Sequence, residues 1–256
     1  MIENNLFDLS GKHAVVVGGA GEIGKVIAEG LAAFGADIAI VDQHRQKIMH
    51  CVKELQETYQ CTAAGYEADI TRKAQVELAV QYILEKFDHI DILVNSAGIN
   101  FREPVISITE DHFDRILQVN LKGILLCCQA VGKHMMKRRY GKIVNIASVS
   151  STLAHTERGS YAASKGGAVQ LTKVMAHEWA KYGITVNAVS PGAVMTSFIT
   201  EMVKSDQQRL KLEQKVPAGR IADPQDIVGP VVFLASEAAD YVTGVNLFVD
   251  GGRTLD

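Results

Sequence analysis

Three side chains in the middle of the chain, Ser148, Tyr161 and Lys165, have the types and spacing needed to move a proton. Tyr161 and Lys165 are four positions apart, so within a helix they share one face. A phenol exchanges a proton with an alcohol near neutral pH only if its pKa falls from about 10, and a nearby ammonium favours the phenolate. Ser148 follows a predicted strand, Ile143–Ile146, where its hydroxyl can bond a substrate oxygen. Alone, such a Tyr-x-x-x-Lys pair is more often a surface pair, and Ser148 alone is a strand-end cap.

A glycine-rich turn near the start of the chain has the pattern of a dinucleotide site. Gly19-Ala20-Gly21-Glu22-Ile23-Gly24 matches G-x-G-x-x-G and lies between a predicted strand, His13–Val17, and a predicted helix from Lys25 to Ala33. Glycines there allow a tight turn and bring backbone N–H groups to a pyrophosphate at the helix N-terminus. Because the chain has 22 glycines, the pattern alone is weak, and the strand before it and the helix after it strengthen it.

Asp42 closes the second predicted strand, Ile38–Val41, and its carboxylate can accept both hydroxyls of an adenosine ribose. The same charge repels the 2′-phosphate of NADP, and Glu22 adds acidic character. Arg45 is close enough in sequence to soften this preference. The alternative is that Asp42 caps the next helix. The sequence therefore favours NAD over NADP as the cofactor.

Short apolar runs alternate with longer amphipathic ones along the chain, which is typical of βαβ units. Continuous apolar runs predict strands that are covered on both faces. We expect one α/β domain over residues 1–256, a Rossmann-type doubly wound parallel sheet with helices on both faces. Further strands are predicted at Ile90–Val94, Lys142–Ile146, Thr185–Val189 and Val245–Val249, and long helices at about His112–Arg138 and Ser160–Lys181. The irregular stretch at about 195–217 follows a strand end and is a candidate substrate lid, or an ordinary surface helix.

Composition excludes several classes of protein. A net charge of −3 and a pI of about 6.2 give no basic surface for nucleic acid or an anionic membrane. The apolar stretches are too short to span a bilayer, and the N-terminus has no signal-peptide pattern. The four cysteines have no metal-like spacing, and we expect reduced thiols, a cytoplasmic location and no metal.

An ordered set of motifs resembles the classical short-chain dehydrogenase/reductases, over about Leu9 to Gly252. Besides the glycine turn, it comprises Asp69-Ile70, Asn95-Ser96-Ala97-Gly98, Asn120, Ser148, Tyr161-x-x-x-Lys165, Pro191-Gly192-x-x-x-Thr196, Tyr241-Val242-Thr243-Gly244 and Val249-Asp250-Gly251-Gly252. Two positions depart from the family pattern. Gly18 stands where Thr is usual, with one residue fewer before Gly24, and Ser96 replaces a common Asn.

The resemblance implies an NAD(P)-dependent alcohol dehydrogenase or carbonyl reductase. Ser148, Tyr161 and Lys165 would handle the substrate proton, and Lys165 would also bond the nicotinamide ribose. Asn120, in a helix that disfavours a short amide, would hold a water of the proton relay. Asp69 would bond the adenine amino group beside Ile70, and the other expected cofactor contacts are Asn95, Ala97, Gly98, Pro191, Gly192, Val194 and Thr196. The long helices resemble those of family dimers and tetramers, which implies a homotetramer.

Polar residues around the expected pocket favour a polyol, sugar or sugar-acid substrate, as in the gluconate-type members. Arg102, His155 and Arg158 could bind hydroxyls or a carboxylate, with Asn100 and Ser148 beside them, or these side chains could point to water. The alternative within the enzyme class is a 3-oxoacyl-thioester reductase that prefers NADPH. The alternative of another class is a non-catalytic cofactor-sensing scaffold, which would be expected to have lost Ser, Tyr or Lys from the site.

Overall fold

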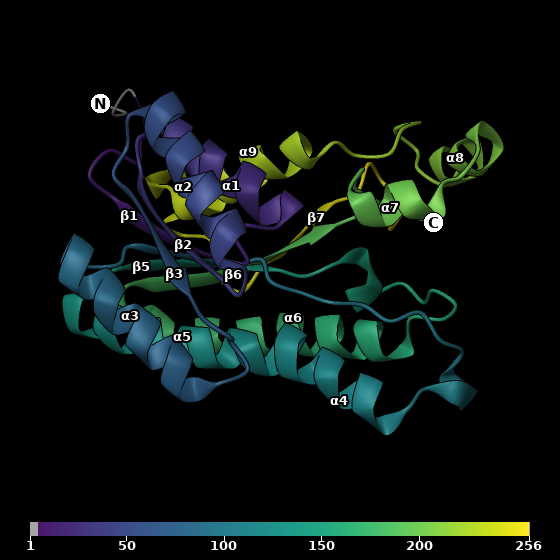
Figure 1. Cartoon of the computed structure of the whole chain (residues 1–256), viewed down its shortest axis with the longest axis horizontal. Coiled ribbons are helices and arrows are strands. Elements are labelled where there is room, and N and C mark those ends of the chain that lie inside the picture. Colours follow the sequence, from purple (N-terminus) through teal and green to yellow (C-terminus); the bar gives the residue numbers. More distant parts are fainter. Residues whose placement is uncertain (1–4, 256) are drawn as a thin grey trace.

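The computed structural model describes residues 5–255, which form a Rossmann-type α/β fold around a parallel sheet (Figure 1). Its seven strands lie in the order β3-β2-β1-β4-β5-β6-β7. Their bounds are β1 His13–Val17, β2 Asp37–Asp42, β3 Ala63–Glu67, β4 Ile92–Asn95, β5 Gly141–Ile146, β6 Ile184–Pro191 and β7 Asn246–Val249. Because all strands run in one direction, their C-terminal ends meet at a single edge, which is where open sheets of this kind bind ligands.

The apolar runs of the strands become two cores, one on each face of the sheet. In β1, Val15 and Val17 pack into the core that contains Met175, whereas Ala14 and Val16 pack into the core on the opposite face. Successive strand side chains point to opposite faces, so a strand covered on both sides must be apolar throughout. This confirms the prediction drawn from the continuous runs.

Helices cover both faces of the sheet (Figure 1). On one face lie α1 (Glu22–Ala33), α2 (Arg45–Tyr59) and α9 (Val228–Ala235), and on the other lie α3 (Lys73–Phe87), α4 (Glu110–Leu117), α5 (Gly123–Arg138) and α6 (Gly159–Trp179). Single-turn 3₁₀ segments occupy Val105–Ser107, Val149–Ser151, Ala180–Tyr182, Pro224–Ile227 and Glu237–Ala239. No helix within residues 5–255 combines the length and the apolar content that a membrane crossing requires.

Two features differ from the sequence-based expectation. The strand β3 was not predicted, because Ala-Ala-Gly-Tyr-Glu is short, small and partly polar at the edge of the sheet. The expected helix from His112 to Arg138 is interrupted by a π-helical segment, Gln118–Lys122, between α4 and α5. Single-turn π-helical segments within α-helices occur frequently at functional sites.

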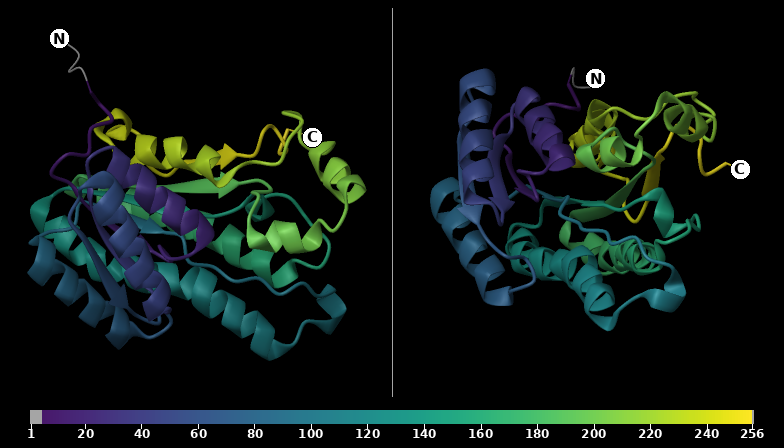
Figure 2. Two further views of the ribbon diagram at one scale, coloured as in Figure 1. Left: turned by 45° about the horizontal axis from the view of Figure 1, so that its top comes forward. Right: turned by 45° about the vertical axis from the view of Figure 1, so that its right-hand side comes forward.

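The stretch predicted as a lid forms two short helices, α7 (Ser197–Met202) and α8 (Asp206–Glu213). They follow β6 and lie beside the C-terminal end of the chain (Figures 1 and 2). The backbone N–H of Ala218, just after this stretch, donates to the carbonyl of Gly251 at 2.9 Å. The stretch is therefore attached to the C-terminal tail at the edge of the sheet where the strands end.

Candidate active site

Ser148, Tyr161 and Lys165 converge at the C-terminal edge of the sheet. Ser148 follows β5 as the N-terminal cap of a 3₁₀ turn, and its Oγ accepts from Ser150 N at 3.1 Å. Tyr161 and Lys165 lie one turn apart in α6, with Lys165 Nζ 5.7 Å from the centre of the phenol ring. The Tyr161 hydroxyl hydrogen-bonds to the Ser148 side chain. The predicted trio is thus brought together from a strand end and a helix.

Burial shifts the pKa values of Tyr161 and Lys165. Burial raises the pKa of Tyr161, while the Ser148 hydrogen bond and the charge of Arg158 lower it. The Arg158 guanidinium lies 5.9 Å from the centre of the Tyr161 ring. Burial also lowers the pKa of Lys165 to about 8, and its Nζ donates to Ile146 O at 2.7 Å. Sequence reasoning assigned the stabilising charge to Lys165 and missed that Arg158 faces the phenol.

Asn120 lies in the π-helical segment and is fully buried. Its Oδ1 accepts from Ile99 N at 2.8 Å, and its Nδ2 donates to Ile99 O at 2.9 Å and to Ser164 Oγ at 3.1 Å. A Cβ on Gly98 would lie 3.5 Å from both Asn120 Oδ1 and Lys165 Nζ. The amide therefore joins the loop after β4 to α6 next to the lysine. Ser164, which sequence reasoning missed, completes this arrangement.

A cavity of about 410 Å³ lies along the C-terminal ends of β1, β2 and β4. Ten of the residues predicted for the cofactor line it, namely Gly21, Glu22, Ile23, Gly24, Asp42, Asp69, Ile70, Ala97, Gly98 and Thr196. Gly24 admits no side chain, because a Cβ there would clash with the carbonyl oxygen of Gly18. A turn in which the backbone itself forms the cavity wall, opening α1, suits a pyrophosphate. The described residues therefore fit a dinucleotide.

Gly18 explains the departure from the family's usual threonine. Its φ is +73°, and a Cβ at this position would lie 2.6 Å from the backbone nitrogen of Ala97. A β-branched residue is strained at such a φ and would also push the turn away from the loop after β4. The shorter turn of this chain thus requires glycine where the longer family turn takes threonine.

Asp42 ends β2 and lines the cavity. Its Oδ2 accepts from Ala20 N at 3.3 Å, and its Oδ1 accepts from Gln43 N at 2.8 Å and His44 N at 3.2 Å. The helix cap of α2 is His44, so Asp42 stabilises the preceding turn without being the cap itself. Around it, His44 and Lys47 line the cavity, whereas the predicted neighbour Arg45 is exposed and does not.

Other residues predicted for the cofactor lie outside the cavity wall. The Asn95 side chain is buried beneath it, with Nδ2 donating to Asn145 Oδ1 at 2.8 Å, because its position at the end of β4 points it between the strands and α5. Gly19 packs against Val16 and Ile40. Val194 is buried in a bridge with Ala222. Pro191 ends β6 with Gly192 directly after it, and the backbone of this connection leads to Thr196 in the cavity wall.

Glu22 has a partner that sequence reasoning did not anticipate. Its two carboxylate oxygens lie 2.8 and 3.1 Å from Ser197 N, at the start of α7. The glycine turn and the predicted lid are therefore connected directly over the end of the cavity. Thr196, which precedes this contact, lines the same cavity.

The predicted substrate side is rich in positive charge. His155 Nδ1 lies 3.3 Å from Ser150 Oγ. Burial lowers the pKa of His155, and four positive charges lower it further, those of Arg158, Arg253, Lys215 and Arg102. Lys215 comes from the end of the stretch predicted as a lid, whereas Arg253 comes from the C-terminal tail, which the sequence had not assigned to this site. Asn100 Oδ1, a predicted substrate contact, is a buried acceptor with no partner among residues 5–255.

The loop after β4 connects to the segment before α6. Glu103 N donates to Glu157 O at 3.0 Å, and the Arg102 guanidinium lies 3.7 Å from the Glu157 carboxylate. The Glu103 carboxylate also pairs with His112 Nδ1 at 2.6 Å. These contacts position Arg102 and Arg158 on neighbouring backbones beside Tyr161.

Comparison with known proteins agrees with this geometry. A protein-family profile described as enoyl-(acyl carrier protein) reductase matches residues 18–254. The 5-keto-D-gluconate 5-reductase of Escherichia coli is 39% identical over 253 residues, which cover 98% of this chain and 99% of that protein. The NAD-dependent glycerol dehydrogenase of Listeria innocua is 36% identical over 250 residues, covering 97% and 96%. A crystal structure of a gluconate 5-dehydrogenase from Burkholderia cenocepacia, in complex with NADP and tartrate, superposes with a TM-score of 0.95 at 38% identity, covering 98% of each chain.

Proposed function

The chain belongs to the short-chain dehydrogenase/reductase family, and on that premise we propose that it interconverts a secondary alcohol and a ketone of a sugar acid or polyol with NAD(H). It is an oxidoreductase whose relatives act on such molecules. The observation that carries the proposal is the group of positive charges around His155, one of which, Arg158, also faces the Tyr161 ring. Arginine and lysine bind carboxylates through charge-assisted hydrogen bonds, which an acyl chain would not use.

In the proposed reaction, the nicotinamide supplies or accepts the hydride when bound. Tyr161 donates its phenolic proton to the carbonyl oxygen as that oxygen becomes an alcohol, and takes the proton back in the oxidative direction. Ser148 bonds the same oxygen and stabilises the charge that develops on it. Burial keeps the phenol protonated, as the reductive direction needs. The charge of Arg158 favours the phenolate that oxidation needs.

Lys165 and Asn120 support this proton transfer. The Lys165 ammonium lies close to the phenol, and its hydrogen bond to the Ile146 carbonyl oxygen fixes its position. Asn120 holds the loop at Ile99 and Gly98 against α6 and so fixes the surroundings of the ammonium. We propose that the two residues relay the proton between Tyr161 and solvent, as the family resemblance implies.

We also propose that NAD is preferred over NADP. Asp42 supports this, because a carboxylate at the end of β2 binds the ribose hydroxyls and repels a 2′-phosphate. Lys47 lines the same end of the cavity and would reduce this discrimination. Steady-state kinetics with both cofactors tests the preference, and strict use of NADPH would overturn it.

A substrate screen that follows NADH absorbance tests the function. It would compare sugar acids, neutral polyols and 3-oxoacyl thioesters with each cofactor. We expect sugar acids to give the highest kcat/KM. Turnover of the thioester with NADPH alone would favour the 3-oxoacyl reductase alternative, and no turnover with any substrate would favour the non-catalytic scaffold.

Arg158→Gln separates carboxylate binding from proton chemistry. Its effect on the Tyr161 phenol is common to all substrates and cancels when kcat/KM for a sugar acid is divided by that for a neutral polyol. Loss of a charge-assisted contact of about 1.5–3 kcal/mol lowers this ratio about tenfold or more. Arg158→Lys should recover part of it, and Arg45→Gln, at an exposed position outside the cavity, should leave it unchanged. An unchanged ratio in Arg158→Gln would contradict the proposed carboxylate site.

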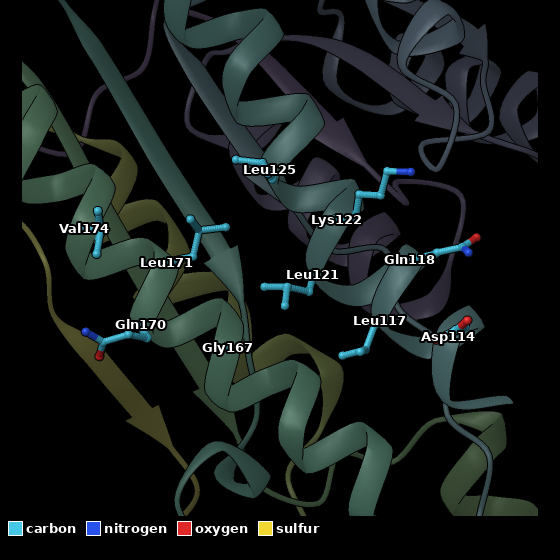
Figure 3. Close-up of a pocket in the computed structure, with 10 residues that line it drawn as sticks. All are labelled: Asp114, Leu117, Gln118, Leu121, Lys122, Leu125, Gly167, Gln170, Leu171 and Val174. Atoms are coloured by element: carbon cyan, nitrogen blue, oxygen red, sulfur yellow. The ribbon is translucent and has the colours of Figure 1, made fainter. Parts of the chain in front are cut away.

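We further propose a homotetramer, with one contact along α4, α5 and α6. A groove of about 790 Å³ there is lined mainly by apolar side chains, among them Leu117, Leu121, Leu125, Leu171 and Val174 (Figure 3). Gly167 allows Leu121 to lie close to the α6 backbone. A second copy of the chain would cover these leucines. Light scattering should give four chains for the native protein and fewer for Leu121→Asp, and a monomeric native protein would refute the assembly. The single domain and the cytoplasmic location remain predictions from the sequence.

A further inference from the structure

Two histidines and an aspartate form a cluster at the edge of the sheet opposite the candidate active site. His13 begins β1, and Asp91 directly precedes β4, which is paired with β1. His89 lies in the connection between α3 and β4. One nitrogen or oxygen atom from each of the three side chains lies within 4.8 Å of those of the other two. Because 76 positions separate His13 from His89, no local spacing in the sequence shows this cluster.

Both nitrogens of each imidazole lie near an oxygen atom. His13 Nδ1 lies 3.2 Å from the backbone carbonyl oxygen of His89, and its Nε2 lies 3.7 Å from Asp37 Oδ2. His89 Nδ1 lies 3.6 Å from Asp88 Oδ2, and its Nε2 lies 3.1 Å from Asp91 Oδ2. An imidazole whose Nδ1–H is donated to an oxygen leaves the Nε2 lone pair for a metal ion, the usual arrangement around metal-ligating histidines. His13 has such an acceptor in the His89 carbonyl, whereas His89 Nδ1 is only within ion-pair distance of Asp88.

The aspartate is fixed in place from outside the cluster. Asp91 is 2% exposed, and its Oδ1 accepts from the Arg138 guanidinium at 2.9 Å. Its Oδ2 accepts from the backbone nitrogen of His13 at 2.9 Å and faces His89 Nε2. Two cations, Arg138 and Lys12, interact with Asp91. Asp37 and Asp88 bring two more carboxylates to the imidazoles, so three carboxylates face two cations and the surroundings stay negative. A cation is therefore favoured at this position.

We propose that His13, His89 and Asp91 bind one divalent transition-metal ion, with Zn²⁺ the best match to two imidazoles and a carboxylate. Tetrahedral zinc with bonds of about 2.0–2.1 Å places its ligand atoms about 3.3 Å apart. The His89 and Asp91 atoms are already at 3.1 Å. The two imidazoles are about one-fifth exposed, so His13 can move inward and water can complete the coordination. The ion would link β1 to the connection before β4 and stabilise the folded chain, at the opposite edge of the sheet from Tyr161.

Titration calorimetry of the full-length protein with ZnCl₂, after removal of metal with a chelator, tests the site. We expect one Zn²⁺ per chain, with affinity reduced about tenfold or more in His89→Gln and in His13→Gln. His50→Gln is the matched control, because His50 is an exposed histidine that pairs with Glu54 on α2, outside the cluster. The affinity of the His50→Gln variant for Zn²⁺ should equal that of the native protein. Circular dichroism would establish that each variant is folded.

Cobalt identifies the ligand atoms independently. Co²⁺ bound by nitrogen and oxygen should give visible d–d bands without the near-ultraviolet charge-transfer band that thiolate ligands produce, and these bands should be lost in His89→Gln. Zinc should also raise the melting temperature of the native protein and not that of His89→Gln. Equal zinc affinity in the native protein and both histidine variants, a thiolate band, or no binding would each overturn the proposal.

Discussion

Replacing Lys165 with methionine is expected to change stability and activity in opposite directions. The ammonium is buried in α6, 4% exposed, with Ile146 O as its hydrogen-bond acceptor. Burial lowers its pKa from 10.5 to about 8. A buried ammonium that is proposed to serve catalysis therefore destabilises the folded state at neutral pH.

The size of this effect follows from proton linkage. A pKa that falls from 10.5 to about 8 corresponds to about 3 kcal/mol of lost stability at pH 7, where both states hold the proton. Between pH 8 and pH 10.5 the unfolded chain binds more protons than the folded chain, so stability from this group rises with pH. The methionine variant loses this penalty, but it leaves the Ile146 carbonyl without its donor, which costs about 1–3 kcal/mol. At pH 7 the variant should be about 0–2 kcal/mol more stable than the native protein.

Urea unfolding of both proteins at equal concentration, from pH 7 to pH 9.5, measures the difference. Other titrating groups are common to the two proteins, so the difference isolates Lys165. Relative to the native protein, the variant should lose about 2 kcal/mol of stability over this range. Lys142→Met is the control, since Lys142 is equally buried but its ammonium pairs with Asp240 at 2.6 Å. That substitution should bring no gain in stability.

A stability difference that does not vary with pH would refute the assignment of a destabilised ammonium to Lys165. Retained turnover in Lys165→Met would refute its proposed catalytic role separately. The stability measurement shows whether burial of the Lys165 ammonium destabilises the fold, and the turnover measurement shows whether the reaction needs that ammonium.

Three further predictions concern the proton donor, the glycine turn and the cofactor. Tyr161→Phe should abolish turnover while NADH fluorescence titration shows nearly unchanged binding; retained kcat would exclude Tyr161 as the proton donor. Gly18→Thr should lose more stability in thermal unfolding than Gly11→Thr, because both positions have a φ of +73° but only Gly18 faces Ala97; equal losses would leave the 2.6 Å approach without effect. Asp42→Ala should raise the KM for NAD about tenfold or more while changing that for NADP little, and an equal rise for both cofactors would refute ribose binding by Asp42.

Local patterns were sufficient to predict most of the framework. The glycine turn, the carboxylate at the end of the second strand and the Tyr-Lys pair on one helix face all depend on residues close in sequence, and the structure shows each of these elements. The edge strand β3 was missed because its small and polar residues do not show a strand pattern. Its backbone is held extended by the parallel pairing with β2. The π-helical segment at Asn120 was missed because an apolar helical pattern does not reveal one extra residue.

Side-chain direction limited the prediction of the site. Asn95 was expected to contact the cofactor, yet it ends β4 and its amide is bonded to Asn145 below the cavity. Arg45 and Lys47 are two positions apart on the same helix, and the helix rotation places Lys47 in the cavity wall. Lys215 and Arg253 join the substrate side because the segment after α8 is bonded to the C-terminal tail, a contact between distant residues.

The sequence by itself determined the parallel fold, the dinucleotide turn and the identity of the residues that could transfer a proton, because these depend on periodicity and short spacing. Only the tertiary structure decided how those residues are charged. It buried Lys165, turned Arg158 toward the phenol of Tyr161 and gathered His13, His89 and Asp91 at the opposite edge. Solvent exclusion and charge neighbours set protonation and ion binding, and both depend on packing between segments that are far apart in the chain.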